Sequence, residues 1–232
     1  MRIDFLKKWW PYIAVGGVGA YGISQIMISP PKPPARPPPP TPTPTPPFTG
    51  ITKLTAYLPA AFFTAVAALE SYFQSRGSKI TGDDLLMMFL AESDCNPSIA
   101  NSIGCAGLNQ ICNLKGVGFT QGVQAYIALP GDQQLVFVQR YFDNVNRYPA
   151  MVDVGSLYLA NFSPAFLGRP DNFVMYREGV DKAYAANRGV DFGKKGFIEV
   201  ADMAKFMRAS AARQPAKFTE LRARLGQARA VA

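Results

Sequence analysis

Histidine is absent from this chain of 232 residues, and cysteine occurs only three times, at Cys95, Cys105 and Cys112. Zinc enzymes rely mainly on His and Cys ligands, and a cysteine nucleophile is usually activated by a neighbouring His. The composition therefore argues against a zinc hydrolase and against a Cys/His catalytic pair. Period-two alternation of polar and apolar side chains is also scarce, so a mostly α fold is expected.

The excess of positive charge is confined to the two ends of the chain. The formal net charge is +8, yet residues 51–202 carry 12 basic and 14 acidic side chains. Residues 1–50 carry five basic and one acidic side chain, and residues 203–232 carry seven and one. A nucleic-acid enzyme is expected to carry its basic side chains on the working domain. The pattern therefore favours a near-neutral domain that does not bind nucleic acid.

The N-terminal segment contains 23 consecutive uncharged residues, 9–31, preceded by three basic side chains. This length is sufficient to cross a bilayer, and Trp9 and Trp10 stand where an interfacial aromatic belt would lie. We expect residues 1–29 to form a membrane anchor with a cytoplasmic N-terminus. A cleaved signal peptide and a buried hairpin are alternative interpretations.

Proline is concentrated in residues 30–47, where it occupies 12 of 18 positions. Such a segment can join neither a helix nor a sheet and adopts an extended polyproline helix. At about 3.1 Å per residue it would reach on the order of 55 Å. We therefore expect residues 30–49 to be a semi-rigid spacer for a domain that acts at a distance from the membrane.

From residue 51 onward, apolar side chains recur with the period of an α-helix. Thr81 is expected to cap one of these helices, and Gly77 to end the helix before it. A small hairpin is an open alternative for residues 111–121. The basic tail from residue 203 onward is expected to be helical, either packed on the domain with its Lys and Arg facing anionic envelope polymers or lipid, or fully solvated. The expected helices cover residues 58–77, 81–93, 131–145, 155–162, 171–189 and 199–213.

Glu92 stands at the end of one of these apolar stretches. It follows Leu85, Met88 and Phe89 by seven, four and three residues, so on a helix it shares their face. Burial raises the pKa of a carboxyl group, which a general acid needs near neutral pH. The other interpretation is a Glu that turns to solvent at the helix end. The loop that follows favours a buried acid, because its glycines and polar side chains suit hydroxyl and acetamido groups.

The residues around Glu92 resemble the signature of lytic transglycosylases, E-S-x-x-N-P followed by S-x-x-G-A-x-G-L-M-Q. The matching positions are Glu92, Ser93, Asn96, Pro97, Gly104, Gly107, Leu108 and Gln110. The sequence departs from the signature at Asn101, Cys105 and Asn109, where Ser, Ala and Met are usual. Of the later A-Y-N-A-G motif, only Tyr158 and Asn161 have counterparts. The resemblance covers residues 80–190, and parts of it are similar to phage-encoded members.

The resemblance implies a lysozyme-like α domain of the soluble-transglycosylase and goose-type-lysozyme kind over residues 50–190, with residues 191–232 as a basic helical extension. It also implies cleavage of the bond between N-acetylmuramic acid and N-acetylglucosamine in peptidoglycan, with an anhydro sugar as product and no metal or cofactor. Glu92 would be the acid and base, Ser93 its hydrogen-bond partner, and Gln110 a saccharide contact. The other supporting or substrate-binding positions would be Gly107, Asn109, Tyr158 and Asn161.

The biological setting has several interpretations. A phage virion protein that opens the wall locally during genome entry is expected first, and an enzyme of a bacterial envelope, conjugation or secretion apparatus has the same parts. In either case the domain would lie outside the cytoplasm on a membrane anchor, beside other virion or envelope proteins. A hydrolytic lysozyme, a silent glycan-binding module and a structural virion membrane protein are the remaining alternatives.

Two further acidic features, one beside Glu92 and one far along the chain, have simpler explanations than catalysis or metal binding. Asp94 is a rival acid, but it lies beyond the apolar stripe and is expected to cap the loop. Residues 191–202 have the frame of a calcium-binding loop, but Gly193 and Lys195 occupy ligand positions, so a metal-free turn is expected.

The three cysteines lie in or beside the same loop. In an oxidising compartment one pair can form a disulfide. Cys95–Cys105 is the first expected pair and Cys105–Cys112 the second, and the absence of any disulfide is an equally open alternative.

Overall fold

The computed structural model describes residues 57–231, and these residues are mostly helical, as the sequence predicted. The predicted membrane anchor and proline spacer, residues 1–49, lie outside the described residues. Within residues 57–231, none of the helices has the length and apolar character needed to cross a membrane.

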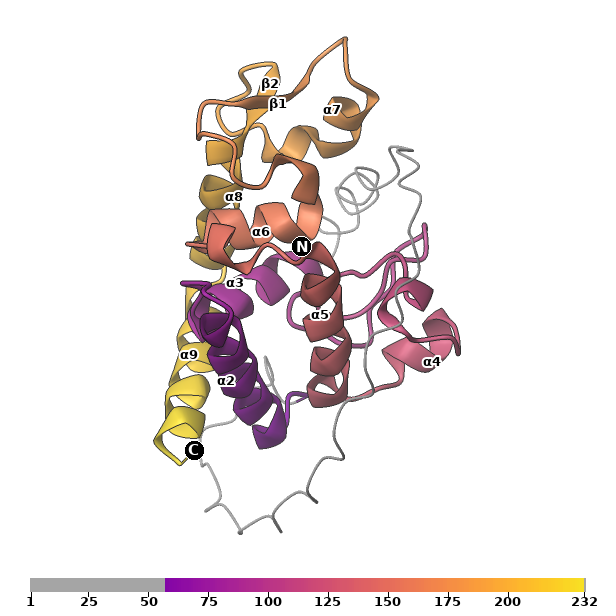
Figure 1. Ribbon diagram of the computed structural model, residues 1–232, viewed down its shortest axis with the longest axis vertical. Helices are drawn as coiled ribbons and strands as arrows, with labels where there is room; N and C mark the ends of the chain where they lie inside the picture. The colour runs from indigo at the N-terminus through magenta and orange to yellow at the C-terminus, as the bar shows by residue number, and fades with distance from the viewer. Residues whose placement is uncertain (1–56, 232) are drawn as a thin grey trace.

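The chain order of the described elements is shown in Figure 1. The α-helices are α2 (Ala60–Ser75), α3 (Gly82–Ser93), α4 (Val123–Ile127), α5 (Gly131–Val145), α6 (Val154–Phe162), α7 (Lys182–Asn187), α8 (Val200–Ala212) and α9 (Pro215–Ala230). The strands are β1 (Val174–Arg177) and β2 (Phe197–Glu199), and single 3-10 turns are η2 (Lys115–Val117), η3 (Tyr148–Ala150), η4 (Pro164–Phe166) and η5 (Arg188–Val190).

The helix that carries Glu92 lies at the centre of the domain. α3 packs against α2, α6, α8 and α9, and these helices surround it in Figure 1. Nine of its 12 residues are buried, so the helix is enclosed on nearly all sides. Beyond its acidic first turn, the helix is apolar on nearly every face, which is typical of a helix in a core position. The last turn of α3, including Glu92, is therefore also removed from water.

The ends of α2 and α3 follow the local signals in the sequence. The Thr81 side chain accepts a hydrogen bond from the Asp84 amide, and the Asp84 carboxylate accepts one from the Thr81 amide, which is a capping box. α2 ends at Ser75, and Gly77 follows with φ +87°, a conformation that glycine adopts without strain. Both predictions, the cap at Thr81 and the stop at Gly77, are confirmed.

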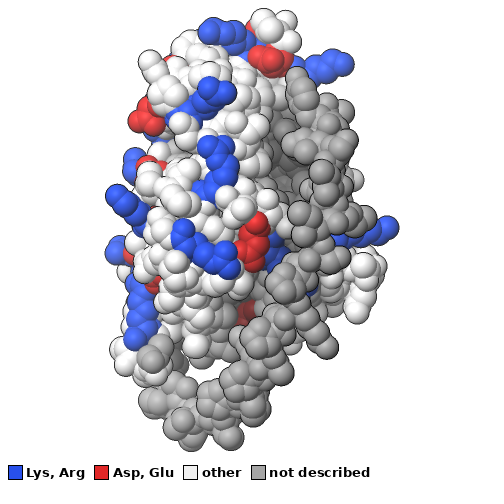
Figure 2. Space-filling model, in the orientation of Figure 1, with Lys and Arg blue, Asp and Glu red and all other residues white. Residues whose placement is uncertain are grey.

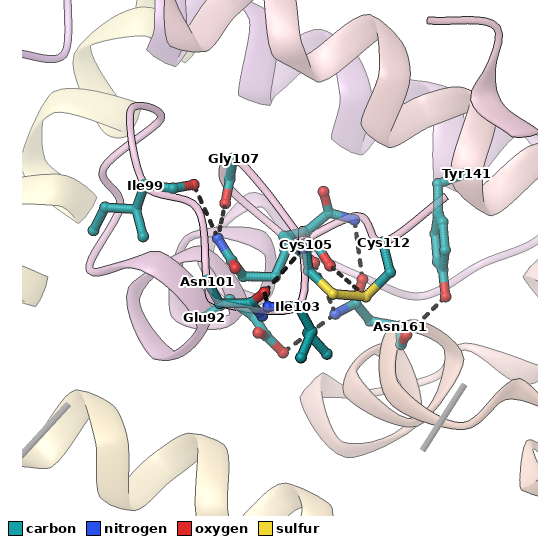
Figure 3. Close-up of a disulfide and its surroundings, with 11 residues drawn as sticks. Glu92, Ile99, Asn101, Ile103, Cys105, Gly107, Cys112, Tyr141 and Asn161 are labelled. Carbon is teal, nitrogen blue, oxygen red and sulfur yellow. Dashed lines mark hydrogen bonds between the residues drawn. A yellow bond between two sulfur atoms is a disulfide. The ribbon is translucent and has the colours of Figure 1, made fainter. Parts of the chain in front are cut away.

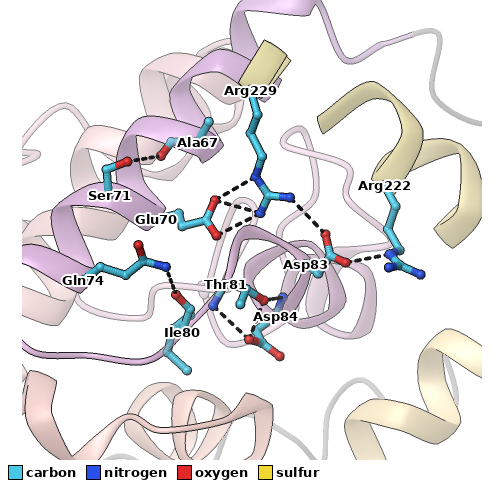
Figure 4. Close-up of polar contacts among 10 residues, drawn as sticks. All are labelled: Ala67, Glu70, Ser71, Gln74, Ile80, Thr81, Asp83, Asp84, Arg222 and Arg229. Carbon is cyan, nitrogen blue, oxygen red and sulfur yellow. Dashed lines mark hydrogen bonds and ion pairs between the residues drawn. The ribbon is translucent and has the colours of Figure 1, made fainter. Parts of the chain in front are cut away.

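The basic tail is docked on the domain through α9. Leu221, Leu225 and Ala228 are buried against the core. At the far end, the Arg229 guanidinium donates to the Glu70 carboxylate of α2 at 2.7 Å, as Figure 4 shows. Lys217, Arg222 and Arg229 of the tail thus form ion pairs with acidic groups of the same chain. The apolar stripe of the tail packs on the domain, which was the first of the two alternatives drawn from the sequence.

The tail and the rest of the domain share one hydrophobic core. The main cluster of buried side chains includes Phe63 and Leu86 as well as Met207 and Leu225. α8 packs against α6, and α9 packs against α2. The core therefore continues across position 190, where the sequence placed the start of an extension.

The predicted helix over residues 171–189 is wrong in its first half. Residues 174–177 form β1, which pairs antiparallel with β2, and only residues 182–187 are helical, as α7. Gly179, with φ +73°, lies in the turn between them. The strand partner lies about twenty residues further along the chain, beyond the range in which a helical period is recognised. The remaining five predicted helices are confirmed to within two residues at each end.

The region considered for a hairpin, residues 111–121, contains the 3-10 turn η2 instead. A tight pairing occurs just before it, where Ala106 and Ile111 exchange both backbone hydrogen bonds at 3.1 and 3.0 Å. Ile111, Leu114 and Val117 then enter a second, smaller apolar cluster under α4 and α5. This cluster, which includes Ala106 and Ile111, holds the loop that follows α3 against the side of the domain.

The visible face in Figure 2 carries Lys and Arg side chains at scattered positions, with acidic side chains between them. The residues coloured in the figure, 57–231, carry 18 basic and 15 acidic side chains.

Candidate active site

The Glu92 carboxyl lies in the last turn of α3 and is 5% exposed. Burial raises its pKa from the ordinary value of 4.5 to about 8, while the Tyr158 and Asn161 side chains lower it. The net effect follows from the enclosed position of α3, because a charged carboxylate loses its hydration there. Glu92 therefore retains its proton at neutral pH, as a general acid requires.

Asn161, in the last turn of α6, is the polar partner of Glu92. Its Nδ2 donates to Glu92 Oε1 at 3.3 Å and to the Asn109 carbonyl at 3.3 Å. Asn109 Nδ2 donates in return to Asn161 Oδ1 at 3.0 Å. The Tyr141 hydroxyl of α5 donates to the Asn161 carbonyl at 2.7 Å, as Figure 3 shows. The loop at Asn109 and the helix α5 thus orient the Asn161 amide that donates to the acid.

Tyr158 lies one turn before Asn161 on α6, and its hydroxyl faces the same carboxyl. The ring is fully buried and stacks on Phe162 and Phe206, with ring centroids 5.7 Å apart in each case. Burial and the charge of Glu92 raise the pKa of Tyr158 well above its ordinary value. The hydroxyl approaches Glu92 closely enough to influence its pKa, but in the described part of the chain no group has the geometry of a full hydrogen bond to it.

Ser93 has other partners than the resemblance implied. Its hydroxyl donates to the Phe89 carbonyl at 3.0 Å and to the Leu108 carbonyl at 2.9 Å, rather than to Glu92. The side chain of Ser93 points in a different direction from that of Glu92, because consecutive helical residues are rotated by about 100°. Ser93 therefore supports the acid indirectly, since it ties the loop at Leu108 to α3.

Gly107 and Gln110 shape the loop itself. Gly107 has φ +75°, and a Cβ there would collide with Gln134 and Tyr126, so only glycine fits. Gln110 Nε2 donates to the Gly107 carbonyl at 2.8 Å, which turns the Gln110 side chain back onto the loop. If Gln110 contacts a saccharide, as the resemblance implies, the contact would therefore be made mainly by its side-chain oxygen, Oε1.

Within residues 57–231, three buried polar atoms around the site have no hydrogen-bond partner of suitable geometry. They are Asn109 Oδ1, Gln110 Oε1 and the Tyr158 hydroxyl. Buried polar groups are almost always hydrogen-bonded, so unpaired ones indicate a place for water or a polar ligand. Together with Glu92 they supply one acid, one hydroxyl and two amide oxygens, which is a suitable set for a molecule rich in hydroxyl and amide groups.

The disulfide in the loop is Cys105–Cys112. The first expected pair, Cys95–Cys105, is wrong, and the second is formed. The reason is the tight pairing of Ala106 with Ile111, because the residues next to a hydrogen-bonded antiparallel pair face each other at closer range. Cys95 is buried in the main core, and its thiol is free.

Asp94 is the C-cap of α3, with φ +57°, and its carboxylate lies 3.0 Å from the Lys217 ammonium. Lys217 is 3% exposed and also donates to the Asp94 carbonyl at 2.8 Å. The Asp94 side chain thus binds α9 and is turned away from Glu92. Its position fits the predicted capping function and offers no support for a second acid.

Two residues that orient the site were not recognised in the sequence. Gln134 is fully buried, accepts from the Leu108 amide at 3.1 Å and donates to the Pro97 carbonyl at 2.8 Å. A signal was present, since Gln134 stands four residues before Val138 on the apolar face of α5. Tyr141 stands three residues after Val138 and so shares this face, but nothing in the spacing indicated that its hydroxyl would meet Asn161 on another helix.

In residues 191–202, which have the spacing of a calcium-binding loop, the acidic side chains bind other groups of the protein. The Asp191 carboxylate accepts from the backbone amides of Lys195 and Gly196 and from the Tyr184 hydroxyl. The Lys195 ammonium lies 2.9 Å from the buried Asp202 carboxylate. Over residues 57–231, no three His, Cys, Asp or Glu side chains gather closely enough to hold a metal ion.

Comparison with models of known protein families, with curated proteins and with solved structures found no match to this chain. The function is therefore argued from Glu92 and the groups around it.

Proposed function

We propose that this protein is a lytic transglycosylase that cleaves peptidoglycan between N-acetylmuramic acid and N-acetylglucosamine, with Glu92 as acid and then base. One observation carries the proposal: a buried carboxyl whose pKa is raised to about 8, beside an oriented amide and three unpaired polar atoms. A carboxyl that keeps its proton at neutral pH can protonate a leaving group, which an ordinary surface Glu cannot do.

The reaction requires only one carboxyl group. Protonated Glu92 donates its proton to the glycosidic oxygen as the bond from this oxygen to C1 of N-acetylmuramic acid breaks. The acetamido group of the substrate stabilises the positive charge at C1. The Glu92 carboxylate then accepts the proton of the C6 hydroxyl as its oxygen bonds to C1, which forms the anhydro sugar and restores protonated Glu92.

The surroundings of Glu92 support this route over a two-carboxylate hydrolysis. Most glycosidases place a second Asp or Glu across the scissile bond. The groups that influence the pKa of Glu92 are Tyr158 and Asn161, and neither is acidic. The nearest acid in sequence, Asp94, is bound to Lys217. Asn161 holds the carboxylate in place between the two proton transfers.

The membrane anchor, the external location and an association with a virion or envelope complex form part of the same proposal. They are supported by the uncharged N-terminal segment and the proline-rich spacer in the sequence. The Cys105–Cys112 disulfide is consistent with an oxidising compartment, because cytosolic thiols are kept reduced. Peptidoglycan strands would then lie within reach of the spacer-borne domain.

The test compares the full-length protein in mild detergent with Glu92→Gln and, as a matched control, Asp94→Asn. Each is incubated with purified peptidoglycan, and the released muropeptides are identified by mass spectrometry. Anhydromuropeptides are expected from the wild type and Asp94→Asn, with a loss of roughly 100-fold or more in Glu92→Gln, since a Gln cannot transfer the proton. Release should decline above about pH 8, where Glu92 loses its proton.

Three results would replace the proposal. Muropeptides with reducing ends would identify a hydrolytic lysozyme. Binding to peptidoglycan without release of product would identify a glycan-binding module. The absence of both binding and release would favour a structural protein.

A further inference from the structure

The Cys105–Cys112 disulfide closes the loop that orients the Glu92 partner. The loop enclosed by the two cysteines is residues 106–111, and it contains Asn109, whose backbone and side chain both bind Asn161. Asn161 in turn donates to Glu92. Figure 3 shows the disulfide in the same region as this chain of contacts. The cross-link is thus two contacts away from the proposed acid.

Hydrogen bonds also tie this loop to its neighbours, among them Gly107 N–H to the Ile99 carbonyl at 2.8 Å. The Ala106–Ile111 pair closes its base, and the Leu108 backbone binds Ser93 and Gln134. Most of the loop is buried, and its exposed end is Cys112. The two tight turns at Gly104 and Gly107 have positive φ and add no bulky side chain to the packing. The covalent link therefore adds to the hydrogen bonds that position Asn109, and it is the one restraint of this set that an external thiol can open.

The two sulfur atoms differ in accessibility. Cys112 is exposed, whereas Cys105 is buried. The third cysteine, Cys95, is fully buried, and burial raises the pKa of its thiol well above the ordinary range. A thiolate from solution can therefore reach Cys112 but not Cys95, and exchange at the loop has no internal competitor.

We propose that the Cys105–Cys112 disulfide is a redox switch of the active site, which holds Asn109 and Asn161 in place when oxidised and releases them when reduced. This inference rests on the proposed function and describes its regulation. In a reducing cytoplasm the newly made enzyme would have a mobile loop and low activity. After transfer to an oxidising compartment the loop would close, so wall cleavage would begin only there.

The chemistry is thiol–disulfide exchange with an external disulfide as oxidant. The Cys112 thiolate attacks one sulfur of the oxidant, forms a mixed disulfide and releases the first thiol. The Cys105 thiolate then attacks the Cys112 sulfur and releases the second thiol. The protein loses two electrons and two protons, and the oxidant gains both as two thiols. Reduction by a dithiol follows the same steps in reverse, beginning at the exposed Cys112.

The experiment measures anhydromuropeptide release by the full-length protein before and after treatment with dithiothreitol, and after reoxidation with oxidised glutathione. Reduction is expected to lower kcat roughly 10- to 100-fold, because misplacement of a positioning group by about 1 Å has effects of this size. Reoxidation should restore the rate. A Cys105→Ala/Cys112→Ala variant should show the low rate with or without reductant, and Cys95→Ala should respond as the wild type does.

If the disulfide positions Asn161 beside Glu92, reduction should also change the pH dependence of the rate, which a general loosening of the fold would not explain. Asn161 lowers the pKa of Glu92, so its release in the reduced protein should shift the alkaline limb of the pH–rate profile to higher pH. Reduced wild type with both thiols verified by alkylation and mass spectrometry, yet with unchanged rate and unchanged profile, would overturn the inference.

A second readout separates this inference from the proposed function. Hydrogen–deuterium exchange of residues 107–110 is followed in both redox states, with circular dichroism as a check that the helices remain folded. At least tenfold faster exchange in the reduced protein is expected. If the oxidised wild type releases no muropeptides, the proposed function fails by itself. If exchange is equal in both states, the switch fails, whatever the activity.

Discussion

Replacement of Glu92 by Gln should stabilise the protein at alkaline pH, because it removes a carboxyl group that is buried at a thermodynamic cost. The pKa of Glu92 is about 8 in the folded protein and 4.5 ordinarily. Between these values the folded state binds a proton that the unfolded state has lost. The contribution of the protonated form to stability is therefore complete below about pH 4.5, declines as pH rises, and is lost above about pH 8.

The magnitude follows from the pKa difference. A tenfold change in proton affinity corresponds to about 1.4 kcal/mol. Between pH 5 and pH 8 the linkage lowers the free energy of unfolding of the wild type by roughly 3.5 kcal/mol. Gln has the shape of a protonated Glu and does not titrate, and its oxygen can still accept from Asn161. The difference in stability between Glu92→Gln and wild type should grow by this amount over the same range.

The assay is urea unfolding followed by circular dichroism at both pH values. Comparison with Glu92→Gln cancels the contribution of the other titrating groups. Asn161→Ala provides a second check, because loss of its hydrogen bond raises the pKa of Glu92 further and shifts the decline in stability to higher pH. Equal pH dependence in the wild type and Glu92→Gln would refute the burial of an ionisable Glu92, and with it the main support for a general acid.

Two further predictions concern the supports of the site. Gly107→Ala should lower the free energy of unfolding by about 2–4 kcal/mol, since the new Cβ would collide with neighbouring atoms and the positive φ is unfavourable for Ala. Gly104→Ala should lower it by only about 1 kcal/mol, because Gly104 has a similar φ but open space around it. Equal values in thermal unfolding would contradict the close packing at Gly107. Lys217→Met should cost about 1–3 kcal/mol because it leaves a partly buried carboxylate unpaired, and the control Arg222→Met, in an exposed ion pair, should cost less than about 1 kcal/mol. Denaturant unfolding distinguishes them, and a larger loss in Arg222→Met would reverse the ranking.

The position of Glu92 was largely predictable from the sequence. Its distance from Leu85, Met88 and Phe89 placed it on an apolar helical face, and in the structure it is 5% exposed. The cap at Thr81 was equally predictable, because a capping box involves residues three apart. These features depend on neighbours within one or two helical turns.

The residues that contact Glu92 and Asp94 were harder to predict from the sequence. Asn161 entered only through the resemblance to a family motif, and its contact with Glu92 spans 69 positions in the chain. Lys217 contacts Asp94 over 123 positions. Periodicity gives no information on such pairs, because they depend on how α6 and α9 pack on α3. For the same reason the β1–β2 pairing was mistaken for a helix.

The sequence by itself determined the helical class of the domain, the presence of an acid on an apolar helical face and the polar loop after it, because each is encoded in local spacing. Only the tertiary structure decided that α3 is enclosed by four helices, that Asn161 meets Glu92, and that Cys105 pairs with Cys112 rather than with Cys95. The physical reason is that the pKa of a carboxyl group and the pairing of two thiols depend on distances in space, which are set by the packing of segments far apart in the chain.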